Sequence, residues 1–324
     1  MVRVSQNGRS AWRSVLAAGA LLAVALQGAA AEGVTVKDAS GREVRVEDAS
    51  HIVSIGGAVT EILYALGLEK RIVAIDITSL YPPRAMAEKP NVGYMRALSP
   101  EGVLGLNPSL VLATEGSGPK EAIAVLQSAK VPFVLVPDPY SGEGIIEKLN
   151  LIAKVTGEEA KGACLAARVR SDLDAVAALR KRIDKPVKVL FVLSFVNGRA
   201  MVAGRNTAAD GIIKLAGGVN AISEYEGYKP INDESVIAAN PDFVLAMNRG
   251  PESLTAETVF ANAAFSATAA SAHKAFVSMD GLYLLGFGPR TARAARDLAA
   301  ALYPELHADK LPSETTGGAA QDCP

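Results

Sequence analysis

The 324-residue sequence predicts an α/β protein in which two pseudo-symmetric, three-layer lobes are joined by one long α-helix. Three observations predict this fold class. Short apolar, β-branched runs alternate with helical patterns along most of the chain, which is typical of layers around a mostly parallel sheet. A strand-free helical stretch divides this alternation near its middle. One segment that precedes the stretch also recurs after it.

The first 31 residues have the pattern of a signal peptide. They carry three arginines and no acid, followed by an apolar run too short to span a bilayer and by the small residues Ala29–Ala31. We expect cleavage near Ala31 and an exported mature chain. The formal net charge falls from −1 for the whole sequence to about −4 for the mature chain, because the three arginines are the only charged residues that cleavage removes. A weakly acidic chain without basic clusters argues against nucleic acid as a partner.

Residues 32–141 are expected to form the first lobe. Its apolar runs have the length and β-branched content of buried strands, and the segments between them have helical periodicity. We predict strands at 51–55, 71–76, 110–113 and 133–136, with helices at 59–67, 100–106 and 120–129.

Residues 142–185 contain no strand-like run and are rich in Ala, Leu, Glu, Lys and Arg. The pair Thr156-Gly157 predicts a break between a short helix and a longer one of roughly 25 residues, which Pro186 ends. Such linking helices would limit domain closure, since a helix lacks the loop hinges that absorb large backbone changes.

Residues 186–308 are expected to form the second lobe, and the small, polar residues 309–324 a disordered tail. Cys164 and Cys323 are the only cysteines. Export permits a disulfide between them, and two unpaired thiols are the alternative. In the second lobe we predict strands at 187–194, 200–203, 243–246 and 276–279, with helices at 207–217 and 291–303.

An internal repeat supports two related lobes. SPEGVLGLNPSLVLAT (99–114) aligns without a gap to NDESVIAANPDFVLAM (232–247), with seven of sixteen positions identical. With one gap, GYMR (93–96) aligns to GYKP (227–230). A helix followed by Asn-Pro and a strand can also recur by chance in α/β proteins. If the repeat is real, Tyr94 and Tyr228 face each other across a cleft between the lobes.

Motifs for catalysis are missing from the sequence. It has no phosphate-binding loop, nucleophile elbow, dinucleotide fingerprint or His-Glu-x-x-His zinc motif. The three histidines, His51, His273 and His307, are each more typical of surface residues than of ligands. We therefore expect a binding protein without an imidazole-type metal site.

Tyr94 and Arg96 carry the most specific chemistry. A free tyrosine has a pKa near ~10, so an anionic phenolate ligand needs help from a metal and a nearby cation. Tyrosine is one of the known protein ligands of haem iron. In an extended segment, Arg96 would point the same way as Tyr94 and could bond its oxygen. A partly buried tyrosine whose hydroxyl has found a partner is the alternative.

At these residues the chain resembles the periplasmic haem-binding proteins that serve bacterial ABC importers, within the class III periplasmic binding proteins that also include siderophore and vitamin B12 receptors. The resemblance runs from about residue 48 to 305. It is carried by VSIGGAVTEILYALG, VGYMRALSPEGVLGLNPSLVLA, MVAGRNTAADGIIKLAGGVNAI and GYKPINDESVIAANPDFVLA.

The resemblance implies roles for four residues. Tyr94 matches the axial ligand of haem b and Arg96 the arginine that bonds the phenolate. Glu101 and Glu234 match the acids, one per lobe, that dock on the permease, although first-turn helix acids are also common for dipole reasons. Some members add a histidine from the second lobe. This chain has Phe195 in that region, so we expect five-coordinate tyrosinate haem.

Haem is a flat apolar plate with two carboxylates, which a cleft between lobes can bury. We expect a monomer in the periplasm that serves an ABC permease dimer and its ATPase, with an outer-membrane haem receptor system upstream. A ferric siderophore or corrinoid receptor is the alternative, followed by an exported enzyme with Tyr94 as general acid. Candidates for the haem faces are Met95, Tyr228 and Met247, and candidates for the propionates are Lys229, Arg205 and Arg249.

Overall fold

The computed structural model describes residues 1–2, 33–248, 250, 253–308 and 323. The predicted signal peptide from residue 3 onward, Arg249, and the predicted tail apart from Cys323 lie outside the described residues. From Val34 onward the chain forms one unit. In the described part of the chain, every helix is too short or too polar to cross a membrane.

The first sheet has four parallel strands in the order β4-β3-β5-β6. All four predicted strands are confirmed to within two residues. Every residue of β3 and β5 is buried, which explains their continuous apolar sequence. The strands are β3 (Ile52–Ile55), β4 (Ile72–Ile75), β5 (Leu110–Thr114) and β6 (Phe133–Val136). The associated helices are α1 (Gly57–Ala65), α2 (Pro83–Glu88), α3 (Pro100–Leu104) and α4 (Lys120–Ser128), with a 3₁₀ turn at Glu69–Arg71.

A short antiparallel hairpin precedes this sheet and was not predicted. It pairs β1 (Val34–Lys37) with β2 (Glu43–Val46). Apolar and polar residues alternate in both strands, and the valines on one side, including Val36 and Val44, are buried in the main core. The hairpin therefore adds its buried valines to the main core.

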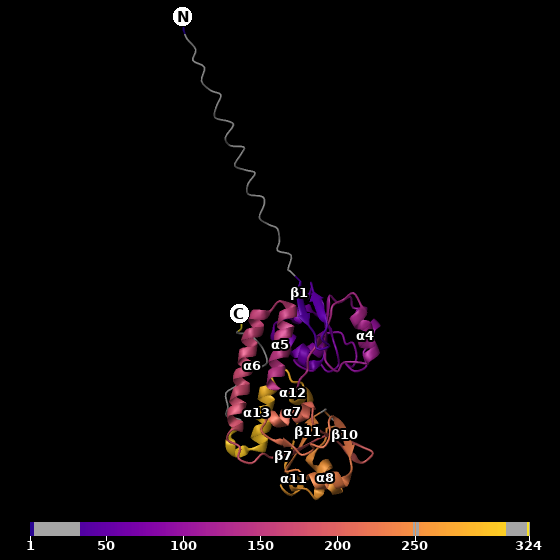
Figure 1. Ribbon diagram of the computed structural model, residues 1–324, viewed down its shortest axis with the longest axis vertical. Helices are drawn as coiled ribbons and strands as arrows, with labels where there is room; N and C mark the ends of the chain where they lie inside the picture. The colour runs from indigo at the N-terminus through magenta and orange to yellow at the C-terminus, as the bar shows by residue number, and fades with distance from the viewer. Residues whose placement is uncertain (3–32, 249, 251–252, 309–322, 324) are drawn as a thin grey trace. The chain divides into compact units, whose positions relative to one another are not determined.

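Two helices connect the sheets and pack side by side (Figure 1). They are α5 (Gly142–Thr156) and the 22-residue α6 (Glu159–Arg180). Gly157 ends α5 in the left-handed conformation, as the predicted break requires. Cys164 of α6 forms a disulfide with Cys323. Of the two alternatives left open by the sequence, a disulfide or two unpaired thiols, the structure has the disulfide.

The second sheet is mixed, with the order β10-β8-β7-β11-β12 and β9 paired to β7. β8 and β10 are antiparallel to their neighbours, so the predicted parallel arrangement holds only for part of this sheet. The strands are β7 (Lys188–Val196), β8 (Arg199–Ala203), β9 (Val219–Asn220), β10 (Tyr228–Ile231), β11 (Phe243–Asn248) and β12 (Phe276–Asp280). The helices are α7 (Ala208–Leu215), α8 (Asp233–Ala239), α9 (Ala256–Phe260), α10 (Ala263–Ser266), α11 (Ala269–Ala272), α12 (Gly281–Leu285) and α13 (Thr291–Leu302), followed by a 3₁₀ turn at Pro304–Leu306.

The two copies of the internal repeat share backbone features that sequence identity alone would not require. Asn107 and Asn240, each before a proline, both adopt left-handed conformations, with φ of 47° and 36°. Gly93 and Gly227, each before a tyrosine, also have positive φ, at 91° and 78°. Each copy continues from a short helix into a strand, α3 to β5 and α8 to β11. The structure therefore supports a pseudo-symmetric origin of the two halves.

The main hydrophobic core crosses both halves of the chain. It includes buried residues of α1, α5, α6, α7 and α13 together with strands of both sheets. A buried ion pair reinforces this connection, because Glu61 of α1 accepts hydrogen bonds from the Arg290 backbone N–H at 3.2 Å and from Arg290 Nη2 at 2.9 Å. The predicted domain boundaries at 141/142 and 185/186 stay predictions, since packing is continuous across them.

Candidate functional site

Tyr94 and Arg96 lie on the segment between α2 and α3, and they interact directly. Arg96 Nη1 donates a hydrogen bond of 2.7 Å to the phenol oxygen of Tyr94. Tyr94 is 37% exposed, so its hydroxyl is accessible to a ligand as well as to Arg96. The backbone is fixed by Gly118, whose N–H donates to Met95 O and whose carbonyl accepts from the Leu98 N–H. Hydrogen bonds on both sides of the segment therefore hold the pair in place.

Met95, between these two residues, points the opposite way. Its side chain is only 8% exposed and packs in the core beside the first sheet. The segment is not extended as predicted, because residues 94–97 form a turn in which the Ala97 N–H donates to the Tyr94 carbonyl at 2.8 Å. The burial of Met95 argues against it as a residue that covers a face of the ligand, and that role stays a prediction.

Tyr228 opens β10 on the second sheet and is also 37% exposed. Its ring packs edge-on against Phe191, with centroids 6.2 Å apart. Burial of the hydroxyl raises the pKa of Tyr228, although hydrogen bonds with the Ala209 N–H and the Thr207 side chain oppose the shift. Arg96 also lowers this pKa, so Arg96 and Tyr228 are within electrostatic range of each other. The structure thus brings together residues from the two copies of the repeat.

Tyr140 is a third member of this group, and sequence reasoning missed it. It lies between β6 and α5 and is 37% exposed. Burial and the Asp138 carboxylate raise the pKa of Tyr140, while Arg96 opposes the shift. Tyr140 in turn raises the pKa of Tyr228. We name Tyr94, Tyr140, Tyr228 and Arg96 the tyrosine cluster.

Tyr94 differs from the other two tyrosines of the tyrosine cluster in its hydrogen bonding. Its phenol oxygen accepts a hydrogen bond directly from the Arg96 guanidinium. The raised pKa values of Tyr140 and Tyr228 favour neutral phenols. Within the described ranges, no group of three or more His, Cys, Asp and Glu residues could hold a metal ion.

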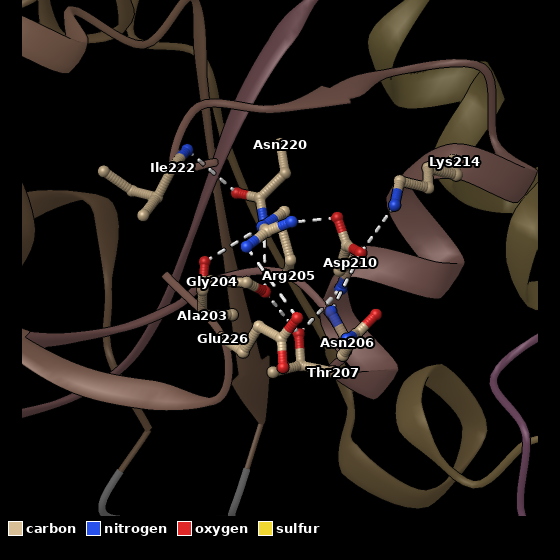
Figure 2. Close-up of polar contacts among 10 residues, drawn as sticks. All are labelled: Ala203, Gly204, Arg205, Asn206, Thr207, Asp210, Lys214, Asn220, Ile222 and Glu226. Atoms are coloured by element: carbon tan, nitrogen blue, oxygen red, sulfur yellow. Dashed lines mark hydrogen bonds and ion pairs between the residues drawn. The ribbon is translucent and has the colours of Figure 1, made fainter. Parts of the chain in front are cut away.

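A polar network fixes the start of α7, where the Tyr228 hydroxyl is held. Figure 2 shows buried Asp210 accepting hydrogen bonds from the Asn206 N–H, the Asn220 amide and the Lys214 ammonium. The Thr207 hydroxyl caps the helix by accepting from the Asp210 N–H at 3.1 Å. This explains part of the sequence AGRNTAADG locally: Asn206, Thr207 and Asp210 build the turn into α7.

The predicted propionate partners are on or beside the second sheet. Lys229 is exposed, and its ammonium lies 4.8 Å from the ring centroid of Tyr225. Arg205 forms an ion pair of 3.7 Å with Glu226, both half-exposed (Figure 2). Arg249 is outside the described residues. Met247, predicted for a ligand face, is partly buried against the main core.

Glu101 and Glu234 occupy equivalent places in the repeat. Each is an exposed residue in the first turn of its helix, α3 or α8. Phe195, which stands where a histidine was considered, packs edge-on against Phe265, with centroids 5.9 Å apart. The glutamates are thus available to a partner, whereas Phe195 belongs to the packing of the second sheet.

Comparisons with known proteins identify the family of this chain. The family model described as "Periplasmic binding protein" matches residues 52–282. The chain belongs to the periplasmic binding protein family. The two sheets and their linking helices confirm the predicted fold class, class III of these binding proteins.

Two solved periplasmic binding proteins are similar over their whole lengths. The periplasmic heme-binding protein BhuT, solved with two hemes, is 38% identical, with a TM-score of 0.74 and coverage of 79% of this chain and 98% of BhuT. The periplasmic heme-binding protein RhuT from Roseiflexus sp. RS-1, solved in apo form, is also 38% identical, with a TM-score of 0.75 and coverage of 80% and 100%.

Sequence relatives extend to other binding proteins of the family. YvrC of Bacillus subtilis (strain 168), an uncharacterized ABC transporter substrate-binding lipoprotein, is 28% identical over 276 residues, or 84% of this chain and 86% of YvrC. The vitamin B12-binding protein of Vibrio parahaemolyticus serotype O3:K6 is 26% identical over 201 residues, or 60% of this chain and 70% of that protein. The family therefore includes binders of more than one macrocycle.

Proposed function

We propose that this protein is a periplasmic substrate-binding protein that captures haem b through Tyr94 and delivers it to the permease of an ABC importer. One observation carries the choice of haem: Arg96 Nη1 donates to the exposed Tyr94 oxygen at 2.7 Å. The similarity to heme-binding proteins at 38% identity supports the same choice.

The pairing of Tyr94 with Arg96 suits ferric haem for an electrostatic reason. A phenolate is a hard anionic ligand, and ferric iron favours its deprotonation. The guanidinium stabilises the same charge through a charge-assisted hydrogen bond. Neutral phenols at Tyr140 and Tyr228 would not compete as anionic ligands. A single tyrosinate, without a second protein ligand, is the coordination that we propose.

The remaining cluster residues suit the shape of haem. In this proposal the exposed Tyr228 ring covers one face of the macrocycle. Lys229 and Arg205 are the proposed partners of the propionates, because both cations are exposed on the second sheet. The protein would bind its cargo without chemical change.

Titration of the purified mature protein with ferric haem tests the ligand directly. We expect saturable binding and the absorption spectrum of high-spin tyrosinate haem. Cyanocobalamin and a ferric hydroxamate siderophore, added under the same conditions, should not compete. Saturable binding of either competitor without binding of haem would contradict the proposal.

A corrinoid is the second candidate because of the vitamin B12-binding relatives, at 26% identity. A corrinoid already carries its cobalt in a four-nitrogen ring and needs no phenolate from the protein. The two candidates therefore differ in how they depend on Tyr94. If cyanocobalamin binds, and binds equally well after Tyr94→Phe, the corrinoid reading replaces the haem reading.

Glu101 and Glu234 are the proposed docking residues for the permease. Replacing both with alanine should leave the haem affinity within about twofold, because neither belongs to the tyrosine cluster, while haem-dependent growth through the importer should fail. Glu121→Ala is the matched control, since Glu121 is also an exposed first-turn acid, on α4. Normal uptake by the double variant would show that these acids do not dock.

The proposed partners and location follow from the same function. The protein would act in the periplasm as a monomer, with an ABC permease dimer and its ATPase downstream and an outer-membrane haem receptor system upstream. A pseudo-twofold protein can present equivalent acids to the two subunits of such a dimer. The equivalent positions of Glu101 and Glu234 in the repeat support this arrangement.

A further inference from the structure

Tyr140 is held in place by elements of both halves of the molecule. Its ring packs against that of Phe287, with centroids 5.4 Å apart and a tilt of 60°. Gly211 of α7 lies directly against its backbone, because a Cβ there would be 2.6 Å from the Tyr140 carbonyl oxygen and 2.8 Å from its Cβ. Despite this packing, Tyr140 remains 37% exposed. A ring that is fixed and exposed is suited to contact a ligand.

The neighbours of Tyr140 connect it to the proposed haem site. Arg96, which bonds Tyr94, acts electrostatically on Tyr140, and Tyr140 acts on Tyr228. A macrocycle several ångströms wide whose iron is bound at Tyr94 would extend from the first sheet toward these two rings. Tyr140 is therefore placed to meet an edge of that macrocycle rather than its iron.

The charges around Tyr140 indicate which edge it meets. The nearest buried cation in sequence, Lys148 of α5, is 0% exposed and already pairs with Asp138 and donates to Phe287 O at 3.2 Å. Lys148 therefore offers nothing to a propionate. The Asp138 and Glu115 carboxylates both act on Tyr140, and Arg96, the cation that also acts on it, already donates to Tyr94, so an additional carboxylate would be disfavoured beside Tyr140.

We propose that Tyr140 is a further ligand-contacting residue of the haem site, whose ring packs against the propionate-free edge of the macrocycle. The proposal rests on the proposed function, since it requires haem bound at Tyr94. It fixes an orientation in which the propionates point away from Tyr140, toward the exposed cations of the second sheet. The contact is made by the aromatic ring, and the hydroxyl contributes no hydrogen bond to the ligand.

Two ligands distinguish a contact made by the Tyr140 ring from a hydrogen bond made by its hydroxyl. They are ferric haem and its dimethyl ester, which has no free carboxylate. Tyr140→Phe should bind each ligand within about twofold of the wild-type protein, because the ring is kept. Tyr140→Leu and Tyr140→Ala should weaken both ligands by a similar factor, about tenfold for alanine. In every variant the absorption spectrum should remain that of tyrosinate haem, because Tyr94 is intact.

Three outcomes would overturn the inference. If Tyr140→Phe weakens haem but not its dimethyl ester, the hydroxyl bonds a propionate and the orientation is reversed. If all variants bind both ligands like the wild type, Tyr140 makes no contact. If Tyr140→Ala lowers the affinity for haem and Tyr140→Leu does not, the volume of the side chain determines the affinity and its aromatic ring does not. Melting temperatures identify misfolded variants, and Tyr140→Phe keeps the orientation testable if the smaller residues do not fold. Failure of the wild type to bind haem would instead contradict the proposed function.

Discussion

Tyr94→Phe should lower the affinity for ferric haem by more than about a hundredfold and remove the tyrosinate absorption bands. The substitution deletes the one oxygen that Arg96 stabilises and leaves the ring in place. Removal of a group that supports a metal ligand typically costs about 10–100-fold in affinity, and removal of the ligand itself should cost more. Absorption titration measures both effects in the same experiment.

Arg96→Ala completes this test, because it removes the support and keeps the ligand. We expect an affinity loss of about 10–100-fold, with a tyrosinate spectrum that persists at saturating haem. Tyr64→Phe is a matched control, since it deletes a tyrosine hydroxyl within the core-facing helix α1. Unchanged haem binding by Tyr94→Phe would remove Tyr94 from the site and end the haem proposal in its present form.

Lys148→Met should lower the free energy of unfolding by about 3–5 kcal/mol, the usual cost when one partner of a buried ion pair is lost. The Lys148 side chain is completely buried and holds both Asp138 and the Phe287 carbonyl. Methionine fills much of the same volume, so the loss would come from the orphaned polar groups rather than from a cavity. Chemical denaturation monitored by circular dichroism measures this change.

Two further variants show whether charge is the cause. Adding Asp138→Asn to Lys148→Met should recover part of the loss, because the unpaired carboxylate is neutralised. Lys154→Met, on the exposed surface of the same helix, should change stability by less than about 0.5 kcal/mol. If Lys148→Met is as mild as Lys154→Met, the buried pair contributes little to the fold.

The strands of both sheets were predictable where burial on both faces requires a continuous run of apolar residues. β6 begins and ends where its apolar run does, and β3 and β5 differ from prediction by one residue. β10 was missed because Tyr228, Lys229 and Pro230 are all exposed on an edge strand, where neither alternation nor continuous apolarity is required. The β1–β2 hairpin was missed since its valines alternate over only four residues each.

The candidate site was predictable only where its residues are close in sequence. Tyr94 and Arg96 are two positions apart, so their contact was predictable, although a turn at 94–97 makes it in place of the extended segment that was expected. Tyr140 had no local signal, because its partners Phe287 and Gly211 are distant along the chain. The burial of Lys148 could not be predicted, because it depends on tertiary packing and the local sequence is that of an ordinary amphipathic helix.

The continuous core has a consequence for how the molecule opens. Each half has a smaller hydrophobic cluster of its own, but the largest cluster includes both α1 and α13, and Arg290 forms an ion pair with Glu61 across the two halves. The chain should unfold as a single cooperative unit, without a stable half-folded intermediate. A ligand bound at Tyr94 would then protect amides of the second sheet from hydrogen exchange as well as those of the first.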